Sequence, residues 1–244
     1  MVKYALHTAL IVIWVVFVTI VLGTTVIIVA LFSKKGNFAH WIARMWGRSI
    51  LFVSRVHVKI TGLENIPSHG SCILMANHQS NFDIPVLLGR LPVQFRWLAK
   101  EELFKIPIFG RGMRGCGYIS IDRSNRKRAF ASLKEAARKI REGVSVLIFP
   151  EGTRSTDGQI RTFKKGGFVL SVDAGVPIVP VVIYGTRSIM PKGRLLIQTR
   201  PVRMDILEPI ETSAFTRKTK DDLMEKVRTI ICEAFDRVAA SENR

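Results

Sequence analysis

The segment Cys72-Ile-Leu-Met-Ala-Asn-His78-Gln-Ser-Asn-Phe-Asp83-Ile-Pro-Val-Leu-Leu88 carries the clearest structural signal in the chain. Its apolar first part predicts a short buried strand, and its last part, with an acid and a proline in the first turn, predicts a helix. On a helix, side chains at i and i+5 point well apart, so the chain must turn between His78 and Asp83 if the two are to meet. We therefore expect His78 just after a strand and Asp83 at the start of a helix.

A histidine and an aspartate in this arrangement have two interpretations. The first is an acid/base pair, in which the carboxylate orients the imidazole. The second is a helix-capping aspartate beside a partly exposed loop histidine. The spacing of His78 and Asp83 alone does not separate them.

Short apolar runs alternate with helical patterns along most of the remaining chain. The runs with strand character are 57–61, 72–76, 95–98, 118–121, 145–149, 178–183 and 195–199. The segments with helical character are 126–141, 163–174 and 219–240. Alternation of this kind predicts an α/β fold with a mixed, mainly parallel sheet flanked by helices.

The N-terminal segment 5–32 has no charged residue. It is longer than the roughly 20 residues that a membrane-spanning helix needs, and it lacks the small-residue cleavage site of a signal peptide. Because it is apolar on every face, a membrane helix is favoured over a helix of a soluble core.

The following segment, 38–55, mixes tryptophan and arginine with aliphatic residues, which is typical of helices at the membrane interface. We expect residues 1–55 to form a two-helix membrane anchor, with Trp14, Trp41 and Trp46 as anchoring side chains. Residues 56–244 would form the α/β domain. The first helix either crosses the bilayer or forms a hairpin with the second within one leaflet, and the sequence leaves both topologies open.

The chain has 37 Lys and Arg against 19 Asp and Glu, a net charge of +18, which implies an anionic partner. A membrane anchor favours an anionic lipid surface over nucleic acid, and no helix-turn-helix or RNA-recognition pattern is present. Lys34, Lys35, Arg44 and Arg48 outnumber Lys3 on the other flank of the first helix. The positive-inside tendency therefore places the domain on the cytoplasmic face of the inner membrane.

Several motifs of other enzyme classes are absent or out of context. The GxGxxG pattern at 110–115 precedes a predicted strand instead of following one, which argues against a dinucleotide site. No GxSxG nucleophile elbow occurs. Cys72, Cys116 and Cys232 are scattered, which disfavours a disulfide framework or zinc site, and a packed thiol is the preferred interpretation of Cys116 over a nucleophile.

The segment Phe149-Pro-Glu151-Gly-Thr-Arg154-Ser155 follows an apolar strand and combines an acid, a glycine, a hydroxyl and a guanidinium in one turn. Such a turn can bind an anion through backbone N–H groups and the arginine. The alternative is a turn closed by a Glu/Arg ion pair. Arg123, which ends the run 117–123, lies at the strand edge where α/β proteins bind ligands.

These segments together resemble the glycerolipid acyltransferase family. The segment 77–83 resembles its HX4D motif, 117–123 its second block, 149–155 its FPEGTRS block and 176–182 its fourth, all in the same order. The likeness covers about residues 62–208. It is greatest to the branch that acylates lysophosphatidic acid.

The resemblance implies transfer of a fatty acyl group from a thioester, acyl-CoA or acyl carrier protein, to the free hydroxyl of lysophosphatidic acid, which yields phosphatidic acid. His78 would be the general base and Asp83 would orient it. The residues that would bind the phosphate are Arg123, Glu151, Gly152, Thr153 and Arg154, with Lys100 and Lys105.

Direct attack on the thioester would need no acyl-enzyme, no metal and no cofactor, and membrane lipids would be partners. The alternatives are acylation of glycerol 3-phosphate or another lysophospholipid, and a non-catalytic lipid-binding membrane protein.

Overall fold

The computed structural model describes residues 2–33 and 36–242. Its centre is a seven-stranded sheet in the order β1-β7-β6-β2-β5-β3-β4. The strands are β1 (Val58–Thr61), β2 (Ile73–Ala76), β3 (Phe95–Lys100), β4 (Ile119–Ile121), β5 (Ser145–Ile148), β6 (Ile178–Tyr184) and β7 (Val202–Ile206). All neighbouring strands are parallel except β6 and β7, which confirms the predicted mixed, mainly parallel sheet.

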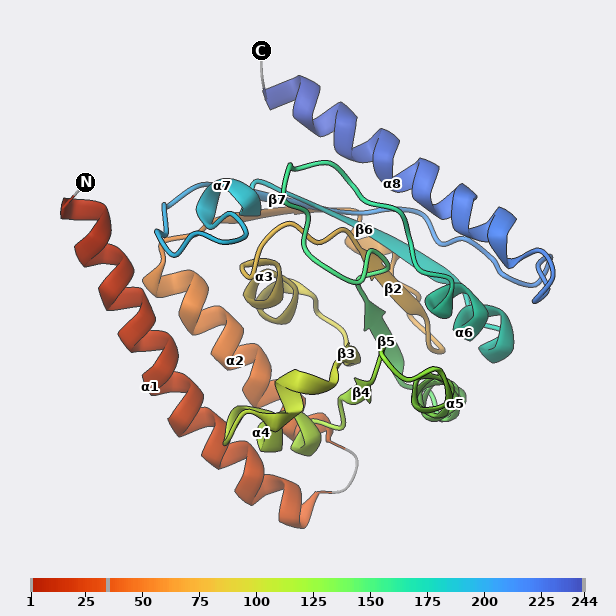
Figure 1. Cartoon of the computed structure of the whole chain (residues 1–244), viewed down its shortest axis with the longest axis horizontal. Helices are drawn as coiled ribbons and strands as arrows, with labels where there is room; N and C mark the ends of the chain where they lie inside the picture. The colour runs from red at the N-terminus through yellow and green to blue at the C-terminus, as the bar shows by residue number, and fades with distance from the viewer. Residues whose placement is uncertain (1, 34–35, 243–244) are drawn as a thin grey trace.

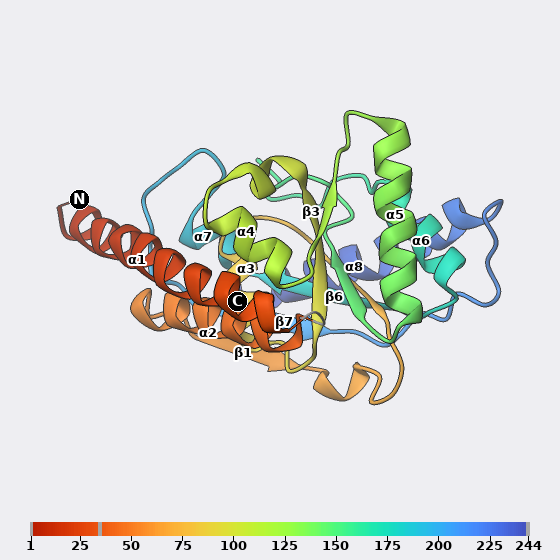
Figure 2. The ribbon, with the colours of Figure 1, turned by 90° about the horizontal axis from the view of Figure 1, so that it is seen from below.

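Helices cover both faces of this sheet (Figures 1 and 2). One layer contains α1 (Val2–Phe32), α2 (Asn37–Val53), α3 (Asp83–Arg90), α4 (Phe109–Gly115) and the short α7 (Thr186–Ile189). The other contains α5 (Arg126–Arg141), α6 (Gly166–Ala174) and α8 (Lys220–Glu242). Two short 3-10 helices, η1 (Leu63–Asn65) and η2 (Glu101–Lys105), follow β1 and β3. Each layer encloses its own hydrophobic cluster against one face of the sheet.

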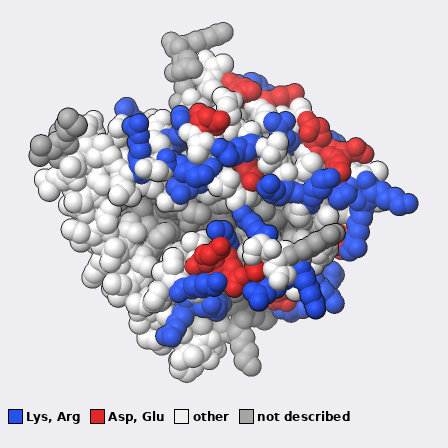
Figure 3. All heavy atoms as spheres, in the orientation of Figure 1, with Lys and Arg blue, Asp and Glu red and all other residues white. Residues whose placement is uncertain are grey.

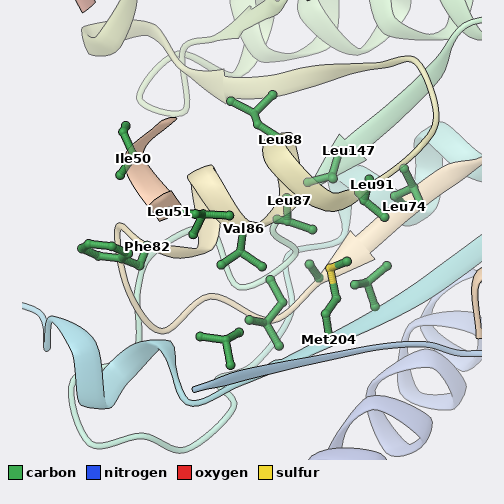
Figure 4. Close-up of a cluster of buried hydrophobic side chains, with 14 of the residues drawn as sticks. Ile50, Leu51, Leu74, Phe82, Val86, Leu87, Leu88, Leu91, Leu147 and Met204 are labelled. Carbon is green, nitrogen blue, oxygen red and sulfur yellow. The ribbon is translucent and has the colours of Figure 1, made fainter. Parts of the chain in front are cut away.

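Helix α2 packs into the first layer through its contact with α3 (Figure 4). Ile50 and Leu51 of α2 join Val86 and Leu87 of α3 in one buried cluster. The helices approach closely because Gly47 has no side chain, and a Cβ atom there would lie 2.9 Å from the Cβ of Leu88. The helix that was predicted to be interfacial is therefore also part of the core.

Helix α1 lies on the outside of α2 and is long and apolar enough to cross a membrane. An 18-residue stretch within its segment Tyr4–Phe32 has a mean hydropathy of 2.8, and 11% of that stretch is buried. The Trp46 indole donates to Thr19 Oγ1 at 2.9 Å and links α2 to α1, while Trp41 is exposed and Trp14 half-buried. The membrane anchor stays a prediction, and Lys34 and Lys35 lie outside the described residues.

Several predictions for the α/β region are wrong. Residues 195–199 form a loop, which the backbone N–H of Ile197 ties to Thr8 Oγ1 of α1 at 2.9 Å. The strand of this region is β7, which pairs with β1 and β6 and was missed. Helix α6 begins at Gly166 instead of residue 163. The glycine pattern at 110–115 lies in α4, a helix that was not predicted.

Candidate active site

Nearly all candidate residues follow parallel strands and meet at one edge of the sheet. His78 follows β2, Lys100 ends β3, Arg123 follows β4 and Glu151 follows β5. These strands are mutually parallel, so their carboxyl ends lie together. This is the edge at which α/β proteins bind ligands.

The structure brings His78 and Asp83 into direct contact. Nδ1 of His78 lies 2.7 Å from Oδ2 of Asp83, which is fully buried at the start of α3. The same oxygen accepts the backbone N–H groups of Gln79 and Ser80 at 2.7 and 2.9 Å. Because a carboxylate can only accept, Nδ1 carries a proton, and in the neutral imidazole Nε2 is then a lone-pair acceptor.

The second ring nitrogen of His78 is available for chemistry. Among the described residues, Nε2 has no hydrogen-bond partner, and the side chain remains 15% exposed. The His78 ring stacks on Phe149, with ring centroids 3.8 Å apart and planes within 7°. Trp97 packs against Phe149 in turn, at 5.3 Å. No sequence pattern indicated this aromatic support beyond the position of Phe149 at the start of its motif.

Glu151 joins the His78 loop to the loop after β5. Its Oε1 accepts the backbone N–H of His78 at 2.7 Å, and its Oε2 accepts that of Arg161 at 2.9 Å. Burial raises the pKa of Glu151 to about 7, and the negative charge of Asp83 adds to the increase, against the two backbone N–H groups, which lower it. No Glu151–Arg154 ion pair occurs within the described ranges, so the alternative of a turn closed by that pair does not hold.

Further polar side chains hold the His78 loop in place, and their role was not foreseen. Asn77 exchanges two hydrogen bonds with the backbone of Ile183 in β6, at 2.9 and 2.7 Å. Gln79 donates to Gly158 O at 2.9 Å, and Ser80 Oγ donates to Met190 O at 2.8 Å. The loop is thus fixed to β6 and to the two segments that border the site.

Cationic side chains surround the turn at Gly152. Arg123 donates to the carbonyl oxygen of Gly152, and Lys192 donates to Thr153 Oγ1 at 3.3 Å and to Arg154 O at 3.1 Å. Gly152 adopts φ 75°, and a Cβ atom there would lie 3.1 Å from Arg123. In the described part of the chain, the Arg154 guanidinium has no hydrogen-bond or ion-pair partner, so it is available to bind an anion. Lys192 was missed because it lies outside the motifs.

Lys100 and Lys105 lie on or beside η2, and their side chains are exposed to solvent. Lys100 pairs with Glu102 at 2.9 Å and Lys105 with Glu101 at 3.7 Å. Within the described part of the chain, no hydrogen bond or ion pair joins either lysine to the turn at Gly152. Figure 3 shows Lys and Arg side chains distributed over this face, with an uncharged side where α1 lies.

The cysteines do not provide a nucleophile at this site. All three are free thiols, and Cys116 is buried. Burial raises the pKa of Cys116 to about 12, which keeps it protonated near neutral pH. Over residues 2–33 and 36–242, no group of three His, Cys, Asp or Glu side chains has the arrangement of a metal site.

Comparison with known proteins connects this site to one enzyme family. Residues 57–184 match the family model described as Acyltransferase. A chloroplastic 1-acyl-sn-glycerol-3-phosphate acyltransferase of Brassica napus is 36% identical over 86% of this chain and 60% of its own length. A 1-acyl-sn-glycerol-3-phosphate acyltransferase of Borreliella burgdorferi is 31% identical over 74% of this chain and 75% of its own.

A solved structure resembles nearly the whole chain. The crystal structure of the 1-acyl-sn-glycerophosphate (LPA) acyltransferase PlsC from Thermotoga maritima matches with a TM-score of 0.84 and 30% identity, over 98% of this chain and 97% of that one. The chain spans 60% and 55% of the length of two plant relatives that it matches.

Proposed function

Because the chain belongs to the Acyltransferase family, we propose that it transfers a fatty acyl group from a thioester to the free hydroxyl of lysophosphatidic acid, forming phosphatidic acid. The relatives and the structural neighbour are named as acyltransferases of 1-acyl-sn-glycerol 3-phosphate, which supports this acceptor. The observation that carries the proposal is the 2.7 Å contact between His78 and Asp83, with Nε2 of the histidine unpartnered in the described part of the chain.

His78 is the general base in this proposal. Its Nε2 takes the proton of the acceptor hydroxyl as the oxygen attacks the thioester carbonyl carbon, which forms a tetrahedral oxyanion. When the carbonyl forms again, the C–S bond breaks and the departing sulfur receives the proton from the imidazolium. Asp83 holds the ring in the required tautomer and stabilises its positive charge without taking the proton itself.

The surrounding residues fix the base instead of touching substrate. Phe149 sets the plane of the His78 ring, and Glu151 fixes the backbone that carries it. Because both Glu151 oxygens accept backbone N–H groups, this side chain has a positioning role, although the sequence also admitted a substrate contact. Cys116 takes no part, and direct attack requires no acyl-enzyme.

We assign the acceptor phosphate to the turn at residues 152–154. Arg154 has an unpaired guanidinium within the described ranges, and Arg123 lies against Gly152. A guanidinium binds phosphate through two parallel hydrogen bonds, and the turn adds backbone N–H groups. Lys100 and Lys105 would bind the phosphate together with these arginines after leaving their glutamate partners. Both Lys–Glu ion pairs lie on the surface and contribute little energy.

In this proposal, helix α1 holds the active site at a membrane. A lysolipid keeps its acyl tail in the leaflet and its hydroxyl at the interface, so a site supported by an apolar helix can reach it. Trp41 is exposed on α2, where an indole suits the interface. We assign the domain to the cytoplasmic face of the inner membrane, on the basis of charge alone.

The test is thiol release from acyl-CoA by the full chain in detergent or vesicles. We expect release with lysophosphatidic acid and its loss in His78→Ala, with lipid binding retained. If thiol were released with glycerol 3-phosphate and not with lysophosphatidic acid, glycerol 3-phosphate would be the acceptor. Unchanged product formation by His78→Ala would refute the assigned base.

A further inference from the structure

A basic cavity lies at the rim of the site, beside the turn that we assign to the acceptor phosphate. Its volume is about 360 Å³, and it is lined by Thr156, Arg187, Ser188, Pro191, Lys192 and Arg194. Three of these residues are cations, two carry hydroxyl groups and none is acidic. None of the motifs in the sequence includes the cations.

The cavity is joined to the catalytic loop through direct contacts. Lys192 donates to Thr153 Oγ1 and to the Arg154 carbonyl, at 3.3 and 3.1 Å. Ser80 of the His78 loop donates to the carbonyl of Met190, two residues before Lys192. The segment that carries Lys192 and Arg194 is therefore held by residues adjoining the site.

Among the described residues, no ion pair neutralises the cations of the cavity. The Arg187 guanidinium donates to the Thr156 carbonyl at 3.2 Å, and it has room because Gly158 lacks a side chain: a Cβ atom there would lie 3.2 Å from it. In the described structure, the Arg194 guanidinium has no hydrogen-bond or ion-pair partner. Three neighbouring positive charges repel one another, and a bound anion relieves that repulsion.

We propose that this cavity binds the phosphate groups of a coenzyme A acyl donor. The proposal rests on the proposed function. The acceptor's phosphate is only a few bonds from its reacting hydroxyl, so it must bind close to His78. The phosphates of coenzyme A are separated from the thioester by the long pantetheine arm. A second phosphate site at the rim, beyond Arg154, therefore suits the donor, and arginines with hydroxyl groups suit its diphosphate and phosphate monoester.

The experiment compares the full chain with the double variant Arg187→Gln/Arg194→Gln, using three substrate series. We expect the KM for acyl-CoA to rise at least tenfold, with kcat and the KM for lysophosphatidic acid unchanged. With an acyl-pantetheine thioester, which has no phosphate, the variant and the wild-type chain should be equal. Arg200→Gln, at an exposed arginine outside the cavity, is the control for loss of a positive charge elsewhere on the surface.

Each other outcome overturns the proposal. A rise in the KM for lysophosphatidic acid alone would assign the cavity to the acceptor. Weaker binding to anionic vesicles with donor KM unchanged would assign it to the lipid surface, and equal loss with acyl-pantetheine would indicate a structural effect.

Calorimetric titration with coenzyme A separates this proposal from the proposed function. If the wild-type chain transferred no acyl group to any acceptor, the proposed function would fail. Coenzyme A binding that is lost in the double variant and retained in Arg200→Gln would still support the cavity, and absence of that binding in the wild-type chain would refute it.

Discussion

The carboxylate of Glu151 accepts the backbone N–H of His78 at 2.7 Å, although 73 positions separate the two residues in the chain. Its second oxygen accepts the N–H of Arg161, and the side chain is 2% exposed. A single buried acid thus sets the position of the loop that carries the proposed base. Both of its oxygens accept a backbone N–H group in this arrangement.

Replacement of Glu151 by Gln tests that positioning role. The amide oxygen can accept one backbone N–H, but the NH₂ group faces the other and leaves it unsatisfied, at a cost of about 1–3 kcal/mol. We expect kcat to fall at least tenfold with a smaller change in the KM for lysophosphatidic acid. Steady-state kinetics and a melting curve measure both effects. An unchanged kcat would show that the contact with His78 does not position the base.

The pKa of Glu151, raised to about 7 by burial, predicts how stability depends on pH. Since the ordinary value is 4.5, the folded state holds a proton between these two values that the unfolded state has lost. Stability from this group is therefore present below pH 4.5 and is lost as pH rises through 7, by on the order of 3 kcal/mol. The difference in unfolding free energy between wild type and Glu151→Gln should shrink from pH 5 to pH 8. A constant difference would contradict the assignment.

The pair His78–Asp83 should behave as one unit. Asp83→Asn keeps the size of the side chain but removes the charge that stabilises the imidazolium, so we expect kcat to fall by about 10²- to 10⁴-fold. His78→Asn should cost at least as much, and the double variant should cost little more than His78→Asn alone. Initial rates at saturating thioester give the three values. Multiplicative losses would mean that the two residues act separately.

The sequence predicted those parts of the site whose residues are close together in the chain better than those that the fold brings together. The strand, turn and helix around His78 and Asp83 follow from apolar runs and from Pro85, and the structure brings the two side chains together. The partners of Glu151 could not be inferred, because they are backbone groups of loops that only the folded sheet brings together. Lys192 was missed for the same reason.

The wrong prediction of a strand at residues 195–199, in place of β7, has a similar origin. The segment 195–199 has the apolar content of a strand, yet Leu195 is 83% exposed and the loop is held by α1. The strand β7 contains Arg203 and Asp205, which weaken its apolar pattern. Asp205 is tolerated because it accepts from Thr61 Oγ1 of β1 at 2.6 Å and from Arg203 Nε at 2.8 Å. A partner such as Thr61, 144 positions away in the chain, is not visible in local periodicity.

The close packing of α2 on α3 gives a prediction that links the N-terminal helices to catalysis. In Gly47→Ala the added Cβ would meet the Cβ of Leu88 at 2.9 Å and the backbone of Gly89 and Pro85 at 3.0 Å, so the helices must separate. Overpacking of this kind costs about 1–3 kcal/mol. Since α3 begins at Asp83, the shift should also lengthen the contact with His78 and lower kcat.

The matched control is Gly166→Ala at the start of α6, where the nearest side-chain atom to an added Cβ is Leu133 Cδ1 at 3.6 Å, an ordinary contact. This variant should melt at or above the wild-type temperature, because alanine favours a helix over glycine by up to about 1 kcal/mol. Both variants are compared with wild type by melting curves and thiol release in the same detergent. If Gly47→Ala kept full stability and turnover, α2 would be a free anchor on the surface instead of a support for the helix that carries Asp83.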